Sequence, residues 1–270
     1  LNDEKLEARL KDVEEMVAGI KKVTAREVYD LTLARAGAEG KKMAGMEGKL
    51  MILDNAGRII EVDAKRSRGE VVAGQLGESK LLASYPGKLM VLTDKGIVEC
   101  SEKSTQCSMK IERDGGWEGI SDLEVWAGNI YLLAPNQVWV YRVTESGYGK
   151  RSAWLGEERE LGESMAIDGN VWVLGKVQGP GSKVQKFVRG VREGEFEIEG
   201  GGEVIYTDGE AEKLYILDRD NGWVMVIKKD GEYESQYVFE EAKTASDVVV
   251  DEINKKMYIL SGSKIFEIDL

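Results

Sequence analysis

The sequence predicts an all-β chain, a six-bladed β-propeller with four-stranded blades, preceded by an N-terminal α-helix. A short apolar run ending in leucine occurs six times, and successive leucines are 39 to 43 residues apart. Turns rich in Asn, Asp and Gly follow most of these runs. A period of about 40 residues built on short strands is typical of propeller blades. The six runs are GKLMIL (48–53), GKLMVL (87–92), GNIYLL (128–133), GNVWVL (169–174), EKLYIL (212–217) and KKMYIL (255–260).

The first expected element is an amphipathic helix or stalk over residues 1–24. Its apolar residues are spaced four and three positions apart, and charged residues fill most positions between them. This seam predicts either a coiled coil that dimerises or a helix that lies on the propeller or spaces it from an upstream domain. Because Leu1 already falls inside the pattern, we expect a larger protein with an upstream domain or membrane anchor. The seam consists of Leu6, Leu10, Val13, Val17 and Ile20.

Residues 25–35, AREVYDLTLAR, are rich in β-forming residues but contain no copy of the repeat. The last repeat stops at Leu270, after what should be its third strand. We therefore expect residues 25–35 to supply the outer strand of blade six, because an unfilled blade leaves a sheet edge open. The propeller then spans 25–270. Its blades are expected at approximately 39–76, 78–113, 119–158, 162–199, 202–240 and 244–270.

Each blade is expected to follow one plan: an innermost strand, the repeated strand, a hairpin turn, a third strand and a more polar outer strand. In blade three the innermost strand is SDLEVW (121–126), and in blade one the hairpin turn is DNAG (54–57). The residue two positions before each repeated leucine is large, so it is expected to pack between neighbouring blades. These residues are Met51, Met90, Tyr131, Trp172, Tyr215 and Tyr258.

Two stretches carry a resemblance to known families. SMAIDGNVWVL (164–174) followed by GSKVQKF (181–187) resembles the six-bladed propellers of the NHL-repeat kind, and the likeness extends over about residues 39–270. AREVYDLTLAR and the general layout are similar to C-terminal propeller domains of bacterial membrane-anchored proteins, some with an upstream PPM-type phosphatase domain. Both resemblances imply architecture. They imply no single activity, because this fold hosts scaffolds, lyases, lactonases and sugar binders.

Composition excludes several classes of function. The net charge is −12, from 37 basic and 49 acidic residues, and no Lys/Arg cluster interrupts the acidic surface. Such a chain repels phosphate backbones and anionic lipid, so neither nucleic acid nor a membrane surface is an expected partner. No apolar run is long enough to span a bilayer, so we expect no membrane insertion by this segment. The absence of histidine excludes a Ser-His-Asp triad and the commonest metal ligand.

The candidate ligand site is the mouth of the central channel, formed by the starts of the innermost strands and the hairpin turns on the same face. Carboxylates recur at those strand starts. They predict either an acidic mouth that takes a cation or basic peptide, or solvated polar residues in an acidic protein. The glycine-rich loop at 175–183 is either a ligand contact through Lys176 and Lys183 or an insertion without function. The candidate carboxylates are Glu78, Asp122, Glu163, Glu203 and Asp247.

Cys100 and Cys107 flank a six-residue connection between the third and outer strands of blade two. They form either a disulfide or a pair of reduced thiols, and a disulfide would favour an extracytoplasmic location. A zinc site usually needs three or four ligands, so the pair predicts no metal site. We expect no cofactor.

The function most consistent with these features is non-catalytic. We expect a recognition or scaffold module that binds a protein, peptide or glycan through the loop face of the propeller. The alternative is a metal-assisted enzyme of the lyase or lactonase type that uses carboxylates at the channel mouth.

Overall fold

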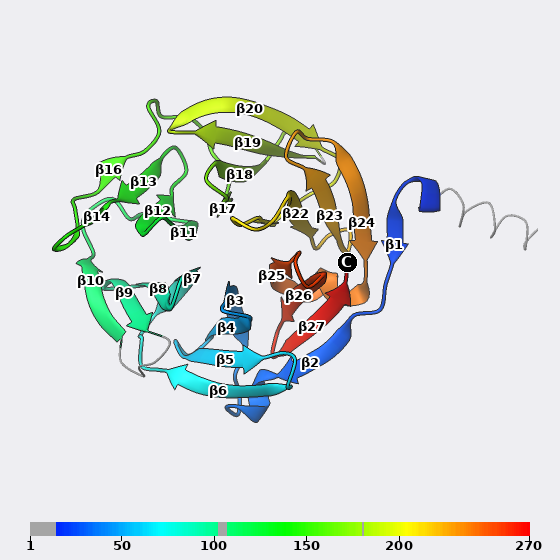
Figure 1. The fold of residues 1–270 in the computed structure, drawn as a ribbon. Coiled ribbons are helices and arrows are strands. Elements are labelled where there is room, and N and C mark those ends of the chain that lie inside the picture. Colours follow the sequence, from blue (N-terminus) through cyan, green and yellow to red (C-terminus); the bar gives the residue numbers. More distant parts are fainter. Residues whose placement is uncertain (1–14, 102–106, 180) are drawn as a thin grey trace, which may run out of the picture.

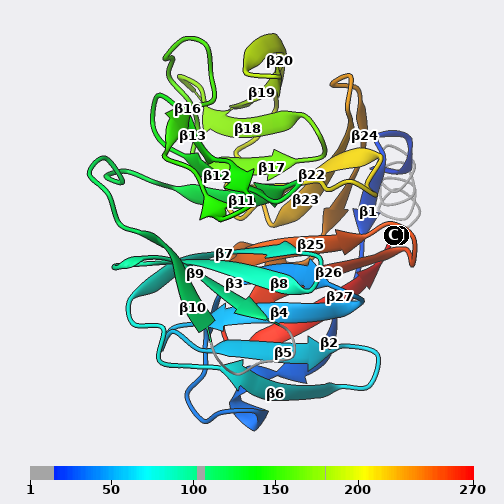
Figure 2. The same ribbon diagram turned by 60° about the vertical axis from the view of Figure 1, so that its left-hand side comes forward.

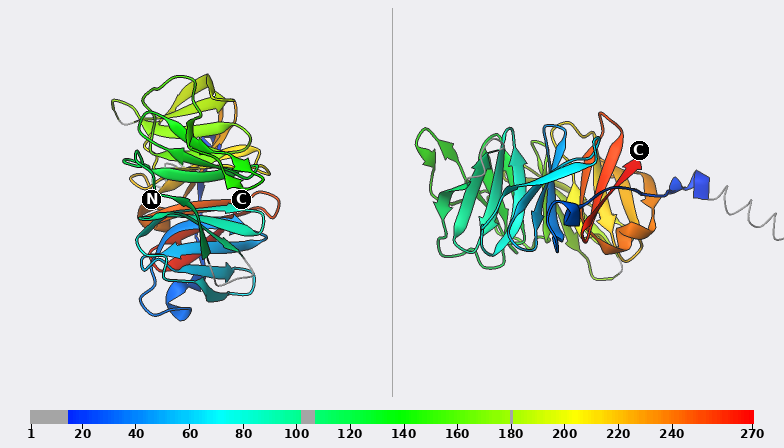
Figure 3. Two further views of the ribbon diagram at one scale, coloured as in Figure 1. Left: turned by 90° about the vertical axis from the view of Figure 1, so that its left-hand side faces the viewer. Right: turned by 90° about the horizontal axis from the view of Figure 1, so that it is seen from below.

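A computed structural model describes residues 15–101, 107–179 and 181–270, and it confirms the six-bladed β-propeller (Figure 1). The blades stand around a central channel, and in blades one to five the chain runs outward from the innermost strand. Side views show a flattened ring (Figures 2 and 3). Among the described residues, no helix is long and apolar enough to cross a membrane.

The first three blades follow one another along the chain. Blade one contains β3 (Gly40–Met46), β4 (Lys49–Asp54), β5 (Ile59–Asp63) and β6 (Arg68–Ala73). Blade two contains β7 (Ser79–Tyr85), β8 (Lys88–Thr93), β9 (Gly96–Ser101) and β10 (Cys107–Glu112). Blade three contains β11 (Asp122–Trp126), β12 (Asn129–Leu133), β13 (Val138–Tyr141) and β16 (Ser152–Ala153). It departs from the expected plan, because β16 is short and a small hairpin precedes it, formed by β14 (Val143–Thr144) and β15 (Gly147–Tyr148).

The last three blades complete the ring. Blade four contains β17 (Ser164–Ile167), β18 (Val171–Lys176), β19 (Ser182–Val188) and β20 (Val191–Ile198). Blade five contains β21 (Val204–Tyr206), β22 (Lys213–Asp218), β23 (Trp223–Lys228), β24 (Tyr233–Val238) and an added strand, β1 (Ile20–Lys22). Blade six contains β25 (Ala245–Asp251), β26 (Lys256–Ser261), β27 (Lys264–Asp269) and β2 (Arg26–Asp30). Two 3-10 turns lie beside these blades, η1 (Leu31–Leu33) and η2 (Glu240–Thr244).

Apolar clusters fill the space between each pair of consecutive blades, including the pair formed by blades six and one. The large residues two positions before the repeated leucines are all buried, as expected. Because each blade is covered on both faces, its inner strands are apolar at successive positions rather than alternate ones.

The ring is closed by the N-terminal strand, as predicted. Strand β2 pairs antiparallel with β27, and Arg26 forms an ion pair of 2.7 Å with Glu267. Tyr29 is buried against blades six and one, and its hydroxyl donates to the Gly69 carbonyl at 3.2 Å. The strand ends at Asp30, whose carboxylate accepts the Thr32 NH and caps η1. The closing strand is therefore shorter than the expected 25–35.

The helix expected to continue to residue 24 ends earlier. Residues 15–17 are helical, and Ile20, assigned to the helical seam, lies in β1, which pairs parallel with β24. Gly19 stops the helix in a left-handed conformation (φ 69°), and its carbonyl accepts the Gln236 NH at 3.0 Å. Pairing with the open edge of β24 thus makes residues 20–22 a strand, although the apolar spacing that includes Ile20 predicts a helix. The other seam residues up to Val13 lie outside the described residues.

Candidate functional site: the channel cavity

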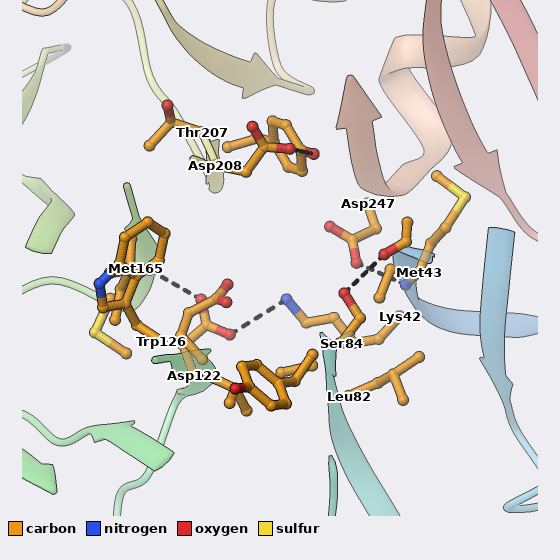
Figure 4. Close-up of a pocket in the computed structure, with 18 of the residues that line it drawn as sticks. Lys42, Met43, Leu82, Ser84, Asp122, Trp126, Met165, Thr207, Asp208 and Asp247 are labelled. Carbon is orange, nitrogen blue, oxygen red and sulfur yellow. Dashed lines mark hydrogen bonds and ion pairs between the residues drawn. The ribbon is translucent and has the colours of Figure 1, made fainter. Parts of the chain in front are cut away.

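All six blades contribute to a cavity of approximately 430 Å³ in the channel (Figure 4). Its walls are the innermost strands, together with the first turns of blades two, three and five at Pro86, Ala127, Thr207 and Asp208. The hairpin turns that we expected at the mouth do not line it. We call this space the channel cavity. Its charged and aromatic lining residues are Lys42, Tyr85, Asp122, Glu124, Trp126, Tyr206, Asp208 and Asp247.

Strand register explains why these side chains meet. In each blade the repeated leucine pairs with one residue of the innermost strand, which defines six equivalent positions around the ring. Side chains alternate along a strand, so residues two and four positions further on share that face. Glu124 and Tyr206 are two positions further on, and Tyr85 and Trp126 are four, whereas Asp208 lies in the turn after β21. The six equivalent residues are Lys42, Leu81, Asp122, Ser164, Val204 and Asp247.

Two of the predicted carboxylates join consecutive blades. Asp122 accepts the Met165 NH of blade four at 2.8 Å and its neighbour's NH, that of Leu123, at 3.0 Å. Asp247 accepts the Met43 NH of blade one at 2.8 Å and the Val248 NH at 3.0 Å. Both side chains are buried. These hydrogen bonds give Asp122 and Asp247 a structural role.

Lys42 is the cation of the channel cavity. Its ammonium lies 3.6 Å from Oδ1 of Asp122 and extends across the cavity toward that residue (Figure 4). Burial alone would lower the pKa of Lys42, but the charges of Asp122, Asp247 and Glu124 outweigh it and raise the pKa above its ordinary value. Lys42 therefore remains protonated and acts as an internal counter-ion.

Glu124 is half-buried and lies two residues after Asp122. Burial raises the pKa of its carboxyl well above the ordinary value, and the charges of Asp122 and Asp247 raise it further. Lys42 and a hydrogen bond from the Val125 NH offset only part of this rise. Among the described residues, no side chain forms a hydrogen bond or ion pair with the Glu124 carboxyl. This group is therefore available to a ligand.

Tyr85, Trp126 and Tyr206 form what we call the aromatic rim. The Tyr206 hydroxyl donates to Oδ2 of Asp208 at 2.7 Å. Burial, with the nearby charges of Asp208 and Glu124, raises the pKa of Tyr206 well above its ordinary value. A Cβ atom at Gly209 would lie 3.2 Å from the Trp126 indole, so glycine at this position leaves room for the ring. The rim adds flat apolar surface beside the charged groups.

The other three predicted carboxylates do not line the channel cavity. Glu78 and Glu163 are exposed. Glu203 is held outside the cavity, because its carboxylate accepts the Arg219 NH at 3.0 Å. Glu163 in blade four and Glu203 in blade five each precede the equivalent position by one residue, so their side chains point to the other face of the strand.

Lys176 and Lys183 lie in paired strands rather than in a loop, because Lys176 pairs with Ser182 and Lys183 with Gly175. Neither lines the channel cavity.

Cys100 and Cys107 lie opposite each other on β9 and β10, and a disulfide joins them, with Cα atoms 4.2 Å apart.

Sequence reasoning missed Lys42, Glu124 and the aromatic rim. A signal was present, because alternation along SDLEVW places Glu124 on the same face as Asp122. Lys42 gave no comparable signal. It follows another lysine in GKKMAGM, and only the pairing of Lys42 with Leu53 shows which of these two lysines points toward the channel.

No protein-family model matches the sequence, and neither does any curated protein. Solved structures do match the fold. A gluconolactonase from Xanthomonas campestris matches with a TM-score of 0.66 and 16% identity, over 91% of this chain and 94% of its own. The calcium-binding protein regucalcin from Agrobacterium tumefaciens matches with a TM-score of 0.63 and 13% identity, over 93% and 95%. A chain of a nidogen/laminin complex matches with a TM-score of 0.57 and 12% identity, over 73% and 78%.

At these identities the matches define the class of protein, a six-bladed β-propeller, and leave its activity open. Assignment to the NHL kind and an upstream phosphatase domain remain predictions.

Proposed function

We propose that this chain is a non-catalytic recognition module, which binds a group of a protein, peptide or glycan partner in the channel cavity. One observation carries the proposal. Asp122 and Asp247 already accept backbone NH groups and Lys42 already pairs with Asp122, whereas the Glu124 carboxyl and the aromatic rim can still contact a ligand. A concave site with apolar walls and a few polar groups is typical of ligand binding. The nidogen/laminin match gives a precedent for a protein-binding propeller.

The second candidate is a metal-assisted enzyme. Two structural neighbours, a gluconolactonase and the calcium-binding protein regucalcin, favour it. Asp122, Glu124 and Asp247 would be the natural ligands for a hard cation. However, the Lys42 ammonium already lies among these carboxylates, and within the described ranges no three acidic or cysteine residues are placed to hold a metal. The residues present therefore do not fit a divalent cation.

Thermal unfolding against a ligand panel tests the two candidates, because a ligand that binds only the folded state raises the midpoint. We expect a shift with a peptide or glycan, and none with Ca²⁺, Mg²⁺, Mn²⁺ or EDTA. In parallel, a pH-stat follows hydrolysis of a panel of lactones. Turnover that is lost in Glu124→Gln and kept in Glu203→Gln would overturn the recognition proposal in favour of an enzyme.

We also propose an extracytoplasmic location, which the Cys100–Cys107 disulfide supports, since disulfides persist in oxidising compartments. Thiol trapping in the native host tests this. Alkylation of both cysteines without prior reduction would contradict it.

A further inference from the structure

We propose that the channel cavity binds an organic cation, an ammonium or guanidinium group on an apolar stem, such as a lysine or arginine side chain of a partner. This inference rests on the proposed function and adds the chemical class of the ligand. The cation would lie beside Glu124, with its stem against the aromatic rim.

The charge of the channel cavity favours a cation. Its lining contains Asp122, Glu124, Asp208 and Asp247, against one basic residue, Lys42. Lys42 therefore does not balance all of the carboxylates. The whole chain carries a net charge of −12, which attracts cations to its surface and repels anions.

Hydrogen bonding points to Glu124 as the contact. Asp122 and Asp247 each accept two backbone NH groups, so their orientations are fixed. Asp208 accepts the Tyr206 hydroxyl and two backbone NH groups. Glu124 accepts only the Val125 NH among the described residues, so its carboxyl can turn toward a ligand.

The aromatic rim fits the remainder of such a ligand. Tyr85, Trp126 and Tyr206 are all half-buried and line the same cavity. Aromatic faces attract ammonium and guanidinium groups and also bury an alkyl stem. A bare metal ion would use neither property, whereas a basic side chain would use both.

Binding would be coupled to a proton. Four groups surround Glu124 in the channel: Lys42 from β3, Asp122 from β11, Tyr206 from β21 and Asp247 from β25. In the free protein, burial and the two aspartates raise the pKa of Glu124. An added cation stabilises the ionised carboxyl, so binding releases a proton. Affinity should increase as pH rises through the raised pKa and level off above it.

Isothermal titration calorimetry tests the proposal with matched probes. One is a capped pentapeptide with a central lysine, and its control carries norleucine at that position. Free n-butylammonium, with 1-butanol as its control, tests whether an ammonium group on an apolar stem binds without a peptide backbone. We expect the lysine peptide and butylammonium to bind and the neutral probes not to bind. Titrations in two buffers of different ionisation enthalpy should show proton release.

Variants locate the site. Glu124→Gln should weaken lysine-peptide binding by at least about tenfold and abolish proton release. Trp126→Ala should weaken binding without abolishing proton release. Glu203→Gln, outside the channel cavity, is the control and should bind like the wild type.

Each alternative result has one meaning. If neutral probes bind as tightly as cationic ones and Trp126→Ala weakens both, the ligand class is wrong while recognition at the cavity stands. If no cationic probe binds at 50-fold excess over the protein, or if Glu124→Gln binds unchanged, the inference is overturned. Turnover in the lactone assay would instead overturn the proposed function itself.

Discussion

The Oδ2 atom of Asp247 in the last blade lies 2.8 Å from the backbone nitrogen of Met43 in the first. Asp122 makes the equivalent contact with the Met165 NH at 2.8 Å, and the Ser164 hydroxyl accepts the Ile205 NH at 3.1 Å. A side-chain oxygen at one repeated position thus joins consecutive blades beside the channel.

Replacing Asp247 by alanine should strongly destabilise the ring, because the buried NH groups of Met43 and Val248 would lose their acceptor. We expect a loss of about 2–4 kcal/mol in the free energy of unfolding, measured by chemical denaturation. Asp247→Asn keeps one acceptor oxygen and should lose less. Glu78→Ala, at an exposed strand start, is the control. Equal losses for Asp247→Ala and Asp247→Asn would contradict this role.

Lys42→Met should destabilise the protein by about 3 kcal/mol at neutral pH, because the carboxylates of the channel cavity lose their counter-ion. Lys42 lowers the pKa of both Glu124 and Asp247, so both values should rise in the variant. The deficit should therefore shrink as acid protonates these groups. Denaturation at neutral and acidic pH measures it, with the exposed Lys176→Met as control. A deficit independent of pH would count against the counter-ion role.

Glu124→Gln should change how stability depends on pH. The folded-state pKa of Glu124 lies above its ordinary value of 4.5, so its contribution to stability is full below about pH 4.5. That contribution is lost as pH rises toward the raised pKa. The wild type should lose stability relative to Glu124→Gln by up to about 1.4 kcal/mol per pH unit in this window. Parallel stability curves for the two proteins would refute the raised pKa.

The blades and the closing strand were predictable, because the period, the turns and the missing outer strand are local patterns. The added strand β1 was not. The apolar spacing that includes Val17 and Ile20 fits a helix, and only the open edge of β24, more than 200 residues later in the chain, makes a strand the better solution.

The site was only partly predictable. Asp122 and Asp247 were found from their place at strand starts, but the same rule also selected Glu163 and Glu203, one residue out of register. A shift of one residue reverses the side of a strand to which a side chain points. Register depends on pairing with the next strand and on bulges, such as the one between Ala245 and Asp247.

The closing strand should be essential to stability. Tyr29→Ala removes a buried ring from between blades six and one, and we expect a cost of about 3 kcal/mol. Leu33→Ala, four residues away at a residue that is 77% exposed, should change stability by less than about 0.5 kcal/mol. Urea denaturation of both variants compares them. Similar midpoints would mean that β2 does not close the ring.

Reduction of the Cys100–Cys107 disulfide should lower the free energy of unfolding by about 2–3 kcal/mol, the loop-closure entropy of an eight-residue loop. Denaturation with and without reductant measures this. The double variant Cys100→Ser/Cys107→Ser should match the reduced protein and be insensitive to reductant. An unchanged free energy of unfolding of the wild type in the presence of reductant would contradict the prediction.

The placement of β1 and β2 on the outside of adjacent blades determines how the protein responds to tension on its N-terminal side. A force applied ahead of residue 15 acts first on the three-residue parallel pairing of β1 with β24 and on the 2.9 Å hydrogen bond from the Tyr233 hydroxyl to Ala18. The load reaches β2 only after β1 has detached. Mechanical unfolding should therefore begin with a small extension that frees residues 15–24 while the channel stays closed.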